Sequence, residues 1–210
     1  MEQHGAVNIS PQNYNHIVVL TGAGISKASG VPTFRGTSGL WNDSEAEKLL
    51  QIEELYRNPD RVWHYLSKLK KIMLEATPNH GHEALARLEA NAKGYWLLTQ
   101  NIDGLHQKAG SKNVIELHGS LLKTKCMNKA CPSSAFEDLQ IHERTPVCSD
   151  CGGKLRPDIV FFNENLGRNG RLAEAVLAEC DLFMAIGTSG IVVPAAYYVQ
   201  HAKKAGARTI

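Results

Sequence analysis

Four cysteines stand in two close pairs and could bind a metal ion. Four residues separate Cys126 from Cys131, sixteen residues follow, and two residues separate Cys148 from Cys151. Two such pairs joined by a short insert are typical of structural zinc sites, in which four thiolates leave no open position for water. Four unrelated free thiols, or a redox pair at Cys148 and Cys151, are the alternatives. We expect the fifth cysteine, Cys180, to be a core residue because it lies at an apolar helix end.

A second group of polar residues follows two apolar runs of the chain. Gln100, Asn101 and Asp103 follow one run, and His118 follows the next. The carboxyl ends of parallel strands meet at one edge of a sheet, where ligands bind. Histidine has an ordinary pKa near neutrality, which suits it to general-base catalysis. This pattern suggests a shared crevice, although a histidine satisfied by structural contacts is the alternative.

A glycine turn follows the first apolar run. Gly22, Ala23, Gly24 and Ser26 belong to the segment GAGIS, which we expect to connect a strand to a helix. Glycines let the backbone approach a phosphate group at such a turn. The match to the dinucleotide fingerprint is incomplete because Lys27 stands at the third glycine position. A tight turn without a ligand is therefore the alternative.

Two further turns carry polar residues that could serve the same ligand. In GVPTFRG at 30–36, Arg35 could bind phosphate and Phe34 could cover a ring, or the segment could be an ordinary loop. Residues 187–190, with the sequence GTSG, form a hydroxyl-rich turn after another apolar run. Neither turn indicates a function when taken alone.

Strand-like and helix-like segments alternate along the chain, which predicts a doubly wound α/β fold with a parallel sheet. Continuous apolar runs suit strands that are buried on both faces. Two polar-rich interruptions, residues 31–80 and 119–157, divide this pattern. The expected strands are 17–20, 95–99, 114–117, 158–162 and 182–187, and the expected helices are 60–75, 82–92, 168–180 and 194–205.

The composition excludes several classes of protein. The chain has 210 residues and a net charge of +2, which does not indicate a nucleic-acid or membrane binder. Its apolar runs fall short of the about 20 residues of a membrane span. Residues 1–16 lack the features of a secretory signal, and five cysteines then point to a reducing compartment. We expect an intracellular protein of the cytoplasm or nucleus, with the mitochondrion as the alternative.

Taken together and in this order, the motifs resemble those of the sirtuins, the NAD-dependent protein deacylases. The resemblance covers about residues 16–210. It implies a Rossmann-like NAD-binding domain with a smaller part made of a helical insert and a zinc-binding module. The implied boundaries are 1–30, 81–118 and 158–210 for the large domain, 31–80 for the insert and 119–157 for the zinc module. The matching motifs are GAGIS at 22–26, GVPTFRG at 30–36, TQNID at 99–103, HG at 118–119, GTS at 187–189 and the two cysteine pairs.

The resemblance also implies roles for individual residues. His118 would be the general base, accepting a proton from the nicotinamide-ribose hydroxyls, while Asn101 and Asp103 would hold the ribose and the carboxamide. The acyl group of an acylated-lysine protein substrate would pass to ADP-ribose, leaving nicotinamide, O-acyl-ADP-ribose and free lysine. NAD binding would involve Gly22, Ala23, Gly24, Ser26, Thr33, Phe34, Arg35, Gln100, Asn101, Ile102, Asp103, Gly187, Thr188 and Ser189; substrate binding would involve Leu66, Leu69, Val160, Phe161 and Phe162; zinc binding would involve Cys126, Cys131, Cys148 and Cys151.

One departure from the family concerns the acyl group. The family branch with Thr-Phe-Arg at the second motif includes desuccinylases and demalonylases, which carry a Tyr-x-x-Arg pair on the helix after a Val-Trp dipeptide. Aligning Val62-Trp63 places Leu66 and Leu69 at those two positions. Leucines cannot pair with a carboxylate, and an unpaired buried charge is unfavourable. We therefore expect acetyl or longer aliphatic acyl groups rather than succinyl.

Two other departures concern the backbone. Asn163 stands where the family usually has glycine before a glutamate, and we expect it to alter how a peptide strand pairs. Residues 207–210 resemble the start of a last sheet strand, whereas the family continues to a final adenine-contacting loop. We therefore expect a shortened chain with weaker NAD binding or poorer folding.

Three functions are compatible with these motifs. The first is an NAD-consuming lysine deacylase, the second an ADP-ribosyl transferase that uses the same glycosidic chemistry, and the third a catalytically weak, zinc-stabilised binding module. Nicotinamide release that requires an acyl-lysine peptide would identify the first. Release with protein labelling would identify the second, and binding without turnover the third. The sequence does not indicate the target proteins or the oligomeric state.

Overall fold

The large part of the molecule is built on a parallel sheet of five strands in the order β3-β2-β1-β7-β8. The computed structural model describes residues 9–33 and 44–210. Every neighbouring pair in this sheet is parallel, which confirms the predicted α/β class. The strands are β1 (Ile17–Thr21), β2 (Tyr95–Thr99), β3 (Val114–Glu116), β7 (Leu182–Ile186) and β8 (Arg208–Thr209).

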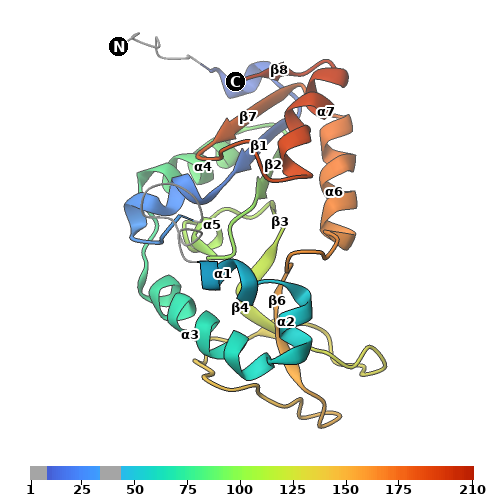
Figure 1. Ribbon diagram of the computed structural model, residues 1–210. Coiled ribbons are helices and arrows are strands. Elements are labelled where there is room, and N and C mark those ends of the chain that lie inside the picture. Colours follow the sequence, from blue (N-terminus) through green and yellow to red (C-terminus); the bar gives the residue numbers. More distant parts are fainter. Residues whose placement is uncertain (1–8, 34–43) are drawn as a thin grey trace.

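Helices cover both faces of this sheet, which explains why its central strands β1, β2 and β7 are mostly apolar (Figure 1). All five residues of β1 are buried. On one face, Val18 and Phe183 pack in a core with α6 (Gly167–Ala178) and α7 (Tyr198–Lys204). On the other face the core includes side chains of β1, β2 and α4 (His80–Asn91): Ile17, Val19, Leu85, Leu97 and Met184 are among its members.

The expected helices form with shifted ends. Pro194 does not occupy the first turn of an α-helix; it precedes the 3-10 helix η4 (Ala195–Tyr197), and α7 follows. The glycine turn after β1 leads into the 3-10 helix η2 (Ala23–Ser29). The remaining short elements are η1 (Pro11–Asn13) and α5 (Leu105–Lys108). Among the described residues, no helix is long and apolar enough to span a membrane.

The smaller part of the molecule combines three helices with a second sheet. The helices α1 (Ser44–Leu49), α2 (Ile52–Arg57) and α3 (Pro59–Glu75) lie within the predicted helical insert. The sheet is antiparallel, has the order β5-β4-β6, and contains β4 (Gly119–Cys126), β5 (Phe136–Glu137) and β6 (Leu155–Ile159). In Figure 1 this part lies below the parallel sheet. The exact domain boundaries stay a prediction.

The prediction of a parallel-sheet strand at 158–162 was wrong. The strand β6 ends at Ile159 and pairs antiparallel with β4, with Gly119 opposite Ile159. The apolar run has another cause: Ile159 and Phe161 are buried in the core of the helical insert, beside side chains of α3. Phe162 is exposed instead. The apolar run alone does not indicate which of the two sheets this segment joins.

Candidate active site

A cavity of about 890 Å³ lies between the carboxyl ends of the parallel strands and the smaller part of the molecule. Most residues predicted from the sequence line it, although they come from distant parts of the chain. Phe34 and Arg35 lie outside the described residues, and Ser26 and Asp103 are buried without lining the cavity. The predicted residues that line it are Gly22, Ala23, Gly24, Thr33, Leu66, Leu69, Gln100, Asn101, Ile102, His118, Val160, Phe161, Phe162, Gly187, Thr188 and Ser189.

Two glycine turns meet backbone to backbone at one end of the cavity. The N–H of Gly24 donates a hydrogen bond to the carbonyl oxygen of Gly187 over 2.8 Å. A Cβ atom on Gly24 would lie only 2.7 Å from that oxygen, so no side chain fits there. Gly187 has a φ of +62°, a left-handed conformation that favours glycine. This wall of the cavity is therefore backbone, because the two turns lie too close together for side chains at these positions.

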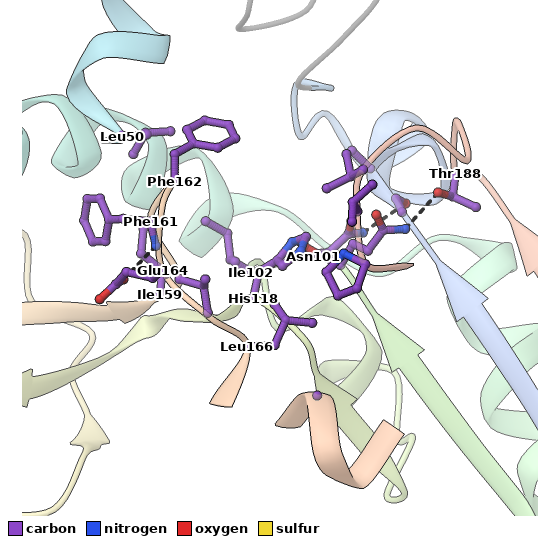
Figure 2. Close-up of a pocket in the computed structure, with 18 of the residues that line it drawn as sticks. Leu50, Asn101, Ile102, His118, Ile159, Phe161, Phe162, Glu164, Leu166 and Thr188 are labelled. Carbon is purple, nitrogen blue, oxygen red and sulfur yellow. Dashed lines mark hydrogen bonds between the residues drawn. The ribbon is translucent and has the colours of Figure 1, made fainter. Parts of the chain in front are cut away.

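His118 lies between this wall and the opposite end of the cavity (Figure 2). Its Nδ1 is 2.8 Å from the carbonyl oxygen of Gln100. Because a carbonyl oxygen can only accept, Nδ1 carries the proton and the neutral ring leaves Nε2 as an acceptor. Burial lowers the pKa of His118, and the hydrogen bond to Gln100 opposes this shift. The ring is therefore neutral at neutral pH and can accept a proton.

Gln100 and Asn101 are held by hydrogen bonds to both glycine turns and to residues below them. The side-chain amide of Gln100 donates to Thr188 Oγ1 over 2.8 Å. The amide of Asn101 donates to Ser26 Oγ at 3.0 Å and to the carbonyl oxygen of Gly22 at 3.2 Å. The Ser26 hydroxyl in turn donates to Asp103 over 2.7 Å. Ser26 and Asp103 thus support Asn101 from beneath the cavity.

Two histidines that the sequence analysis did not single out extend this buried network. Nδ1 of His82 accepts a hydrogen bond from the N–H of Asn79, so its proton is on Nε2, 3.3 Å from Ser26 Oγ. Burial lowers the pKa of His82, and nearby Asp103 opposes the shift. Asn79 also caps α4, in a capping box with His82. The asparagine three residues before the histidine is the one sequence signal that could have indicated its position.

The second histidine, His106, is buried beside Thr21, the last residue of β1. Thr21 donates its hydroxyl proton to Thr99 over 2.9 Å, so His106 Nε2, 3.0 Å from Thr21 Oγ1, is the donor in that contact. Nδ1 of His106 has no partner among the described residues. Burial, together with His82 at 4.8 Å between ring centroids, lowers the pKa of His106 to about 3. A lone histidine in a four-residue helix carries no spacing signal.

The other end of the cavity is aliphatic and aromatic. Leu66 and Leu69 of α3 line it and are almost fully buried. Ile159 contributes from the end of β6, Phe161 from the segment after it, and Leu50 from the residue after α1. In Figure 2, Leu50 and Phe161 lie at the opposite end from Asn101 and Thr188, with His118 between. The cavity thus joins a polar, backbone-lined end to an apolar end.

Residues 160–163 form the rim between these ends. The N–H of Phe162 donates to the carbonyl oxygen of Leu50 over 2.9 Å, and the N–H of Val160 donates to the carbonyl oxygen of His118 over 2.9 Å. Asn163 has a φ of +68°. Glycine adopts this left-handed conformation readily, and asparagine tolerates it. The asparagine side chain also donates to Gln51 Oε1 over 3.1 Å, which ties the rim to the helical insert.

The four predicted zinc ligands converge. The sulfur atoms of Cys126, Cys131, Cys148 and Cys151 all lie within 4.8 Å of one another, with pairs at 3.6 and 3.8 Å. Tetrahedral zinc with bonds of about 2.3 Å to sulfur separates its ligands by about 3.8 Å, so the cluster fits zinc. The N–H of Asn128 points at Cys126 Sγ over 3.4 Å. Cys180 is buried elsewhere and is a core residue, as predicted.

Comparisons with known proteins agree with this site. The Sir2 family model matches residues 22–194. NAD-dependent protein deacylase 2 of Pyrobaculum aerophilum is 46% identical over 196 residues, covering 93% of this chain and 78% of that protein. An NAD-dependent protein deacylase of Aquifex aeolicus is 44% identical over 201 residues, covering 95% and 83%. The crystal structure of a Sir2 homolog–NAD complex superposes with a TM-score of 0.85 at 38% identity, covering 94% of this chain and 77% of that one. The chain therefore belongs to the Sir2 family.

Proposed function

We propose that this protein is an NAD-dependent protein-lysine deacylase. The observation that supports this most directly is the position of His118, whose Nε2 is free to accept a proton where the polar and apolar ends of the cavity meet. The two curated relatives described above are both named NAD-dependent protein deacylases. When bound, NAD supplies the ribose that releases nicotinamide and takes up the acyl group.

The residues around the cavity have different proposed roles, which depend on their positions. The backbone wall at Gly22, Gly24 and Gly187 gives a phosphate group close approach without a side chain in the way. Gln100 and Asn101 present amide groups whose orientation is fixed by hydrogen bonds, from Gln100 to Thr188 and from Asn101 to Ser26. A preorganised amide loses little conformational freedom when a ligand binds, so it orients the ligand efficiently.

His118 acts as the general base in this proposal. Its Nδ1–H bond to the Gln100 carbonyl fixes the ring and keeps Nε2 available to accept a proton from a ribose hydroxyl. The lowered pKa keeps the ring neutral, which a base requires. Asn101, held by Ser26 and Asp103, lies on the same side of the cavity and orients the reacting sugar. The family resemblance assigns NAD contacts to Phe34 and Arg35, which lie outside the described residues.

The acyl group occupies the apolar end of the cavity in this proposal. Leu66 and Leu69 stand where a carboxylate-binding tyrosine and arginine would be needed, and Phe161 and Ile159 add further apolar surface. A succinyl carboxylate would lose its hydration here without gaining a partner. The predicted substrates are therefore acetyl-lysine and lysines with longer aliphatic acyl groups. The peptide itself would lie along Val160 and Phe162.

Zinc has a structural role in this proposal. Cys126, Cys131, Cys148 and Cys151 would hold the ion in a closed four-thiolate set, which supplies folding free energy and no open position for a reacting water. All four are free thiols in the structure, which suits a reducing, intracellular compartment. The proposed substrates are proteins acylated on lysine. The proposed activity involves neither nucleic acid nor a membrane.

A peptide panel with NAD tests the function. Acetyl-, decanoyl- and succinyl-lysine peptides of one sequence are incubated with NAD, and nicotinamide and deacylated peptide are both quantified. We expect equal amounts of the two products with acetyl and decanoyl peptides, and little with succinyl. Efficient desuccinylation would contradict the acyl prediction. Nicotinamide release with protein labelling but without acyl peptide would favour an ADP-ribosyl transferase, and peptide binding without turnover a binding module.

The variant His118→Ala tests the assigned base. It should abolish turnover while zinc content and melting temperature stay those of the unchanged protein, because His118 is a half-buried side chain bonded to one carbonyl. The matched control is His64→Gln, which changes an exposed histidine of α3 and should keep full activity. Full activity of His118→Ala would show that the base is another residue.

A further inference from the structure

An ion pair at the apolar end of the cavity joins Glu164, which lines the cavity, to Arg156, which does not. Arg156 of β6 is buried, and its two terminal nitrogens donate to the two carboxylate oxygens of Glu164 at 2.7 and 2.6 Å. Such two-point contacts fix direction as well as distance. The remaining donors reach the carbonyl oxygens of Ile159 and Pro157, at 2.9 and 3.4 Å. Every nitrogen of this guanidinium is therefore engaged.

This ion pair holds Phe161 from two sides. The guanidinium carbon of Arg156 lies 4.9 Å from the centroid of the Phe161 ring, in a cation–π contact. The N–H of Phe161 donates to Glu164 Oε2 over 2.9 Å, so the same carboxylate fixes its backbone. Phe161 is almost fully buried and lines the cavity, whereas Arg156 does not line it. The ring therefore stands between the cavity and the guanidinium.

Stabilisation of the fold alone does not explain an ion pair between Arg156 and Glu164 at this position. Arg156 is buried, whereas the Glu164 side chain is 25% exposed. An ion pair that is largely removed from water often stabilises a fold no better than apolar residues of similar volume, because its charges lose hydration. What a two-point pair supplies is a fixed geometry, here for Phe161 and for the turn from Ile159 to Glu164. Burial raises the pKa of Glu164, but its hydrogen bond and ion pair with Arg156 outweigh this, and the net pKa is lowered.

We propose that Arg156 and Glu164 are positioning residues that fix Phe161 as the wall of the acyl pocket and so set which acyl chain lengths the enzyme accepts. This inference rests on the proposed deacylase function. Without the guanidinium, the Phe161 ring can move into the space behind it, and the pocket becomes deeper. Longer chains should then gain relative to acetyl, because one methylene in an apolar pocket changes discrimination by about tenfold or more.

The test compares the unchanged protein with Arg156→Met and with the double variant Arg156→Met plus Glu164→Gln, which leaves no unpaired charge. Two quantities are measured with the same peptides: kcat/KM for decanoyl over acetyl, and the ratio of their dissociation constants by fluorescence anisotropy without NAD. Both should shift toward decanoyl by about tenfold. The KM for NAD should stay within about twofold, because the NAD end of the cavity is lined by other residues.

Two further variants keep the result interpretable. Arg156→Lys retains the charge but not the two-point contact, and it should shift the ratio in the same direction if Arg156→Met fails to fold. Lys125→Met is the matched control: it removes a neighbouring cation that pairs with Asp158 at 2.8 Å and should leave the ratio unchanged. Melting temperature and zinc content confirm folding of each variant.

The outcomes separate this inference from the function on which it rests. If the unchanged protein deacylates the peptides but the folded Arg156 variants keep its chain-length ratio, the positioning role is wrong. The same conclusion follows if Lys125→Met shifts the ratio equally. If the unchanged protein neither binds nor deacylates any acyl peptide, the proposed function itself fails, and this inference fails with it.

Discussion

Buried His106 should make the protein less stable in mild acid. Its Nε2 donates to Thr21, its Nδ1 has no partner among the described residues, and His82 lies against its ring. A second proton would place a charge and an unsatisfied donor in the core. The perturbation is therefore a change from pH 7 to pH 5, with His106→Gln as the variant that removes the titrating group but keeps an amide donor for Thr21.

The size of the effect follows from the difference between two pKa values. His106 has a pKa of about 3 in the folded protein, against an ordinary histidine pKa of 6.5 in the unfolded chain, so only the unfolded chain takes up this proton between those values. The stabilisation is complete above the unfolded pKa and declines as the pH falls. Between pH 7 and pH 5 the loss is about 2 kcal/mol, from about 1.36 kcal/mol per pH unit. That corresponds to roughly 4–8 °C in melting temperature for a chain of this size.

The assay is thermal unfolding followed by circular dichroism at pH 7, 6 and 5, at constant ionic strength. His82 acts in the same direction, because burial lowers its pKa as well, so some dependence on pH will remain in His106→Gln. The difference between the two proteins isolates His106: the variant should lose about 2 kcal/mol less between pH 7 and pH 5. His64→Gln, at an exposed site, should behave like the unchanged protein. Parallel curves for His106→Gln and the unchanged protein would refute the reasoning.

Three other measurements test the site. The acid limb of the pH profile of kcat/KM should lie below the ordinary histidine pKa, because burial lowers the pKa of His118; a limb above that value would exclude His118 as its origin. Leu66→Tyr combined with Leu69→Arg should raise the ratio of desuccinylation to deacetylation about tenfold or more, since a hydrogen bond to a charged group stabilises by roughly 1.5–3 kcal/mol; an unchanged ratio would show that the acyl group lies elsewhere. Zinc removal by a chelator should shift Trp63 fluorescence to longer wavelength and lower the melting temperature, because Trp63 packs on Cys148 and Leu155; zinc should restore both, and indifference to the chelator would contradict a structural role.

The polar residues of the site could be predicted because they follow strands. Gln100, Asn101 and His118 come after apolar runs, and parallel strands bring such positions to one edge whatever the connections are. The cysteine pairs were equally predictable, since their spacing suits one ion. His82 and His106 could not be found in this way. Neither follows a predicted strand, and the hydroxyl partners, Ser26 for His82 and Thr21 for His106, are 56 and 85 residues away in the chain.

The fold, like the site, was predictable where the cause lies in the segment itself and was not predictable where it lies in residues far away in the chain. The strand at 95–99 was predicted to the residue, because four of its five residues are buried and form part of a short apolar run. The segment at 158–162 was assigned to the wrong sheet because its burial comes from the helical insert, more than 80 residues earlier in the chain. Arg156 lay outside the prediction for a related reason: a buried arginine is recognisable only when its carboxylate partner, Glu164, is seen beside it.

The contact between the two glycine turns has a consequence for how tightly the cavity can hold a ligand. At Gly22, Gly24 and Gly187 the wall contains no side chain and therefore no rotamers that binding must freeze. The two turns are held in place by the sheet itself, through the bond from the Gly24 N–H to the Gly187 carbonyl oxygen and the pairing of β1 with β7. Ordering of side chains is a large part of what opposes association. This end of the site is rigid before the ligand arrives, so its recognition is entropically inexpensive and depends on the packing of the sheet core.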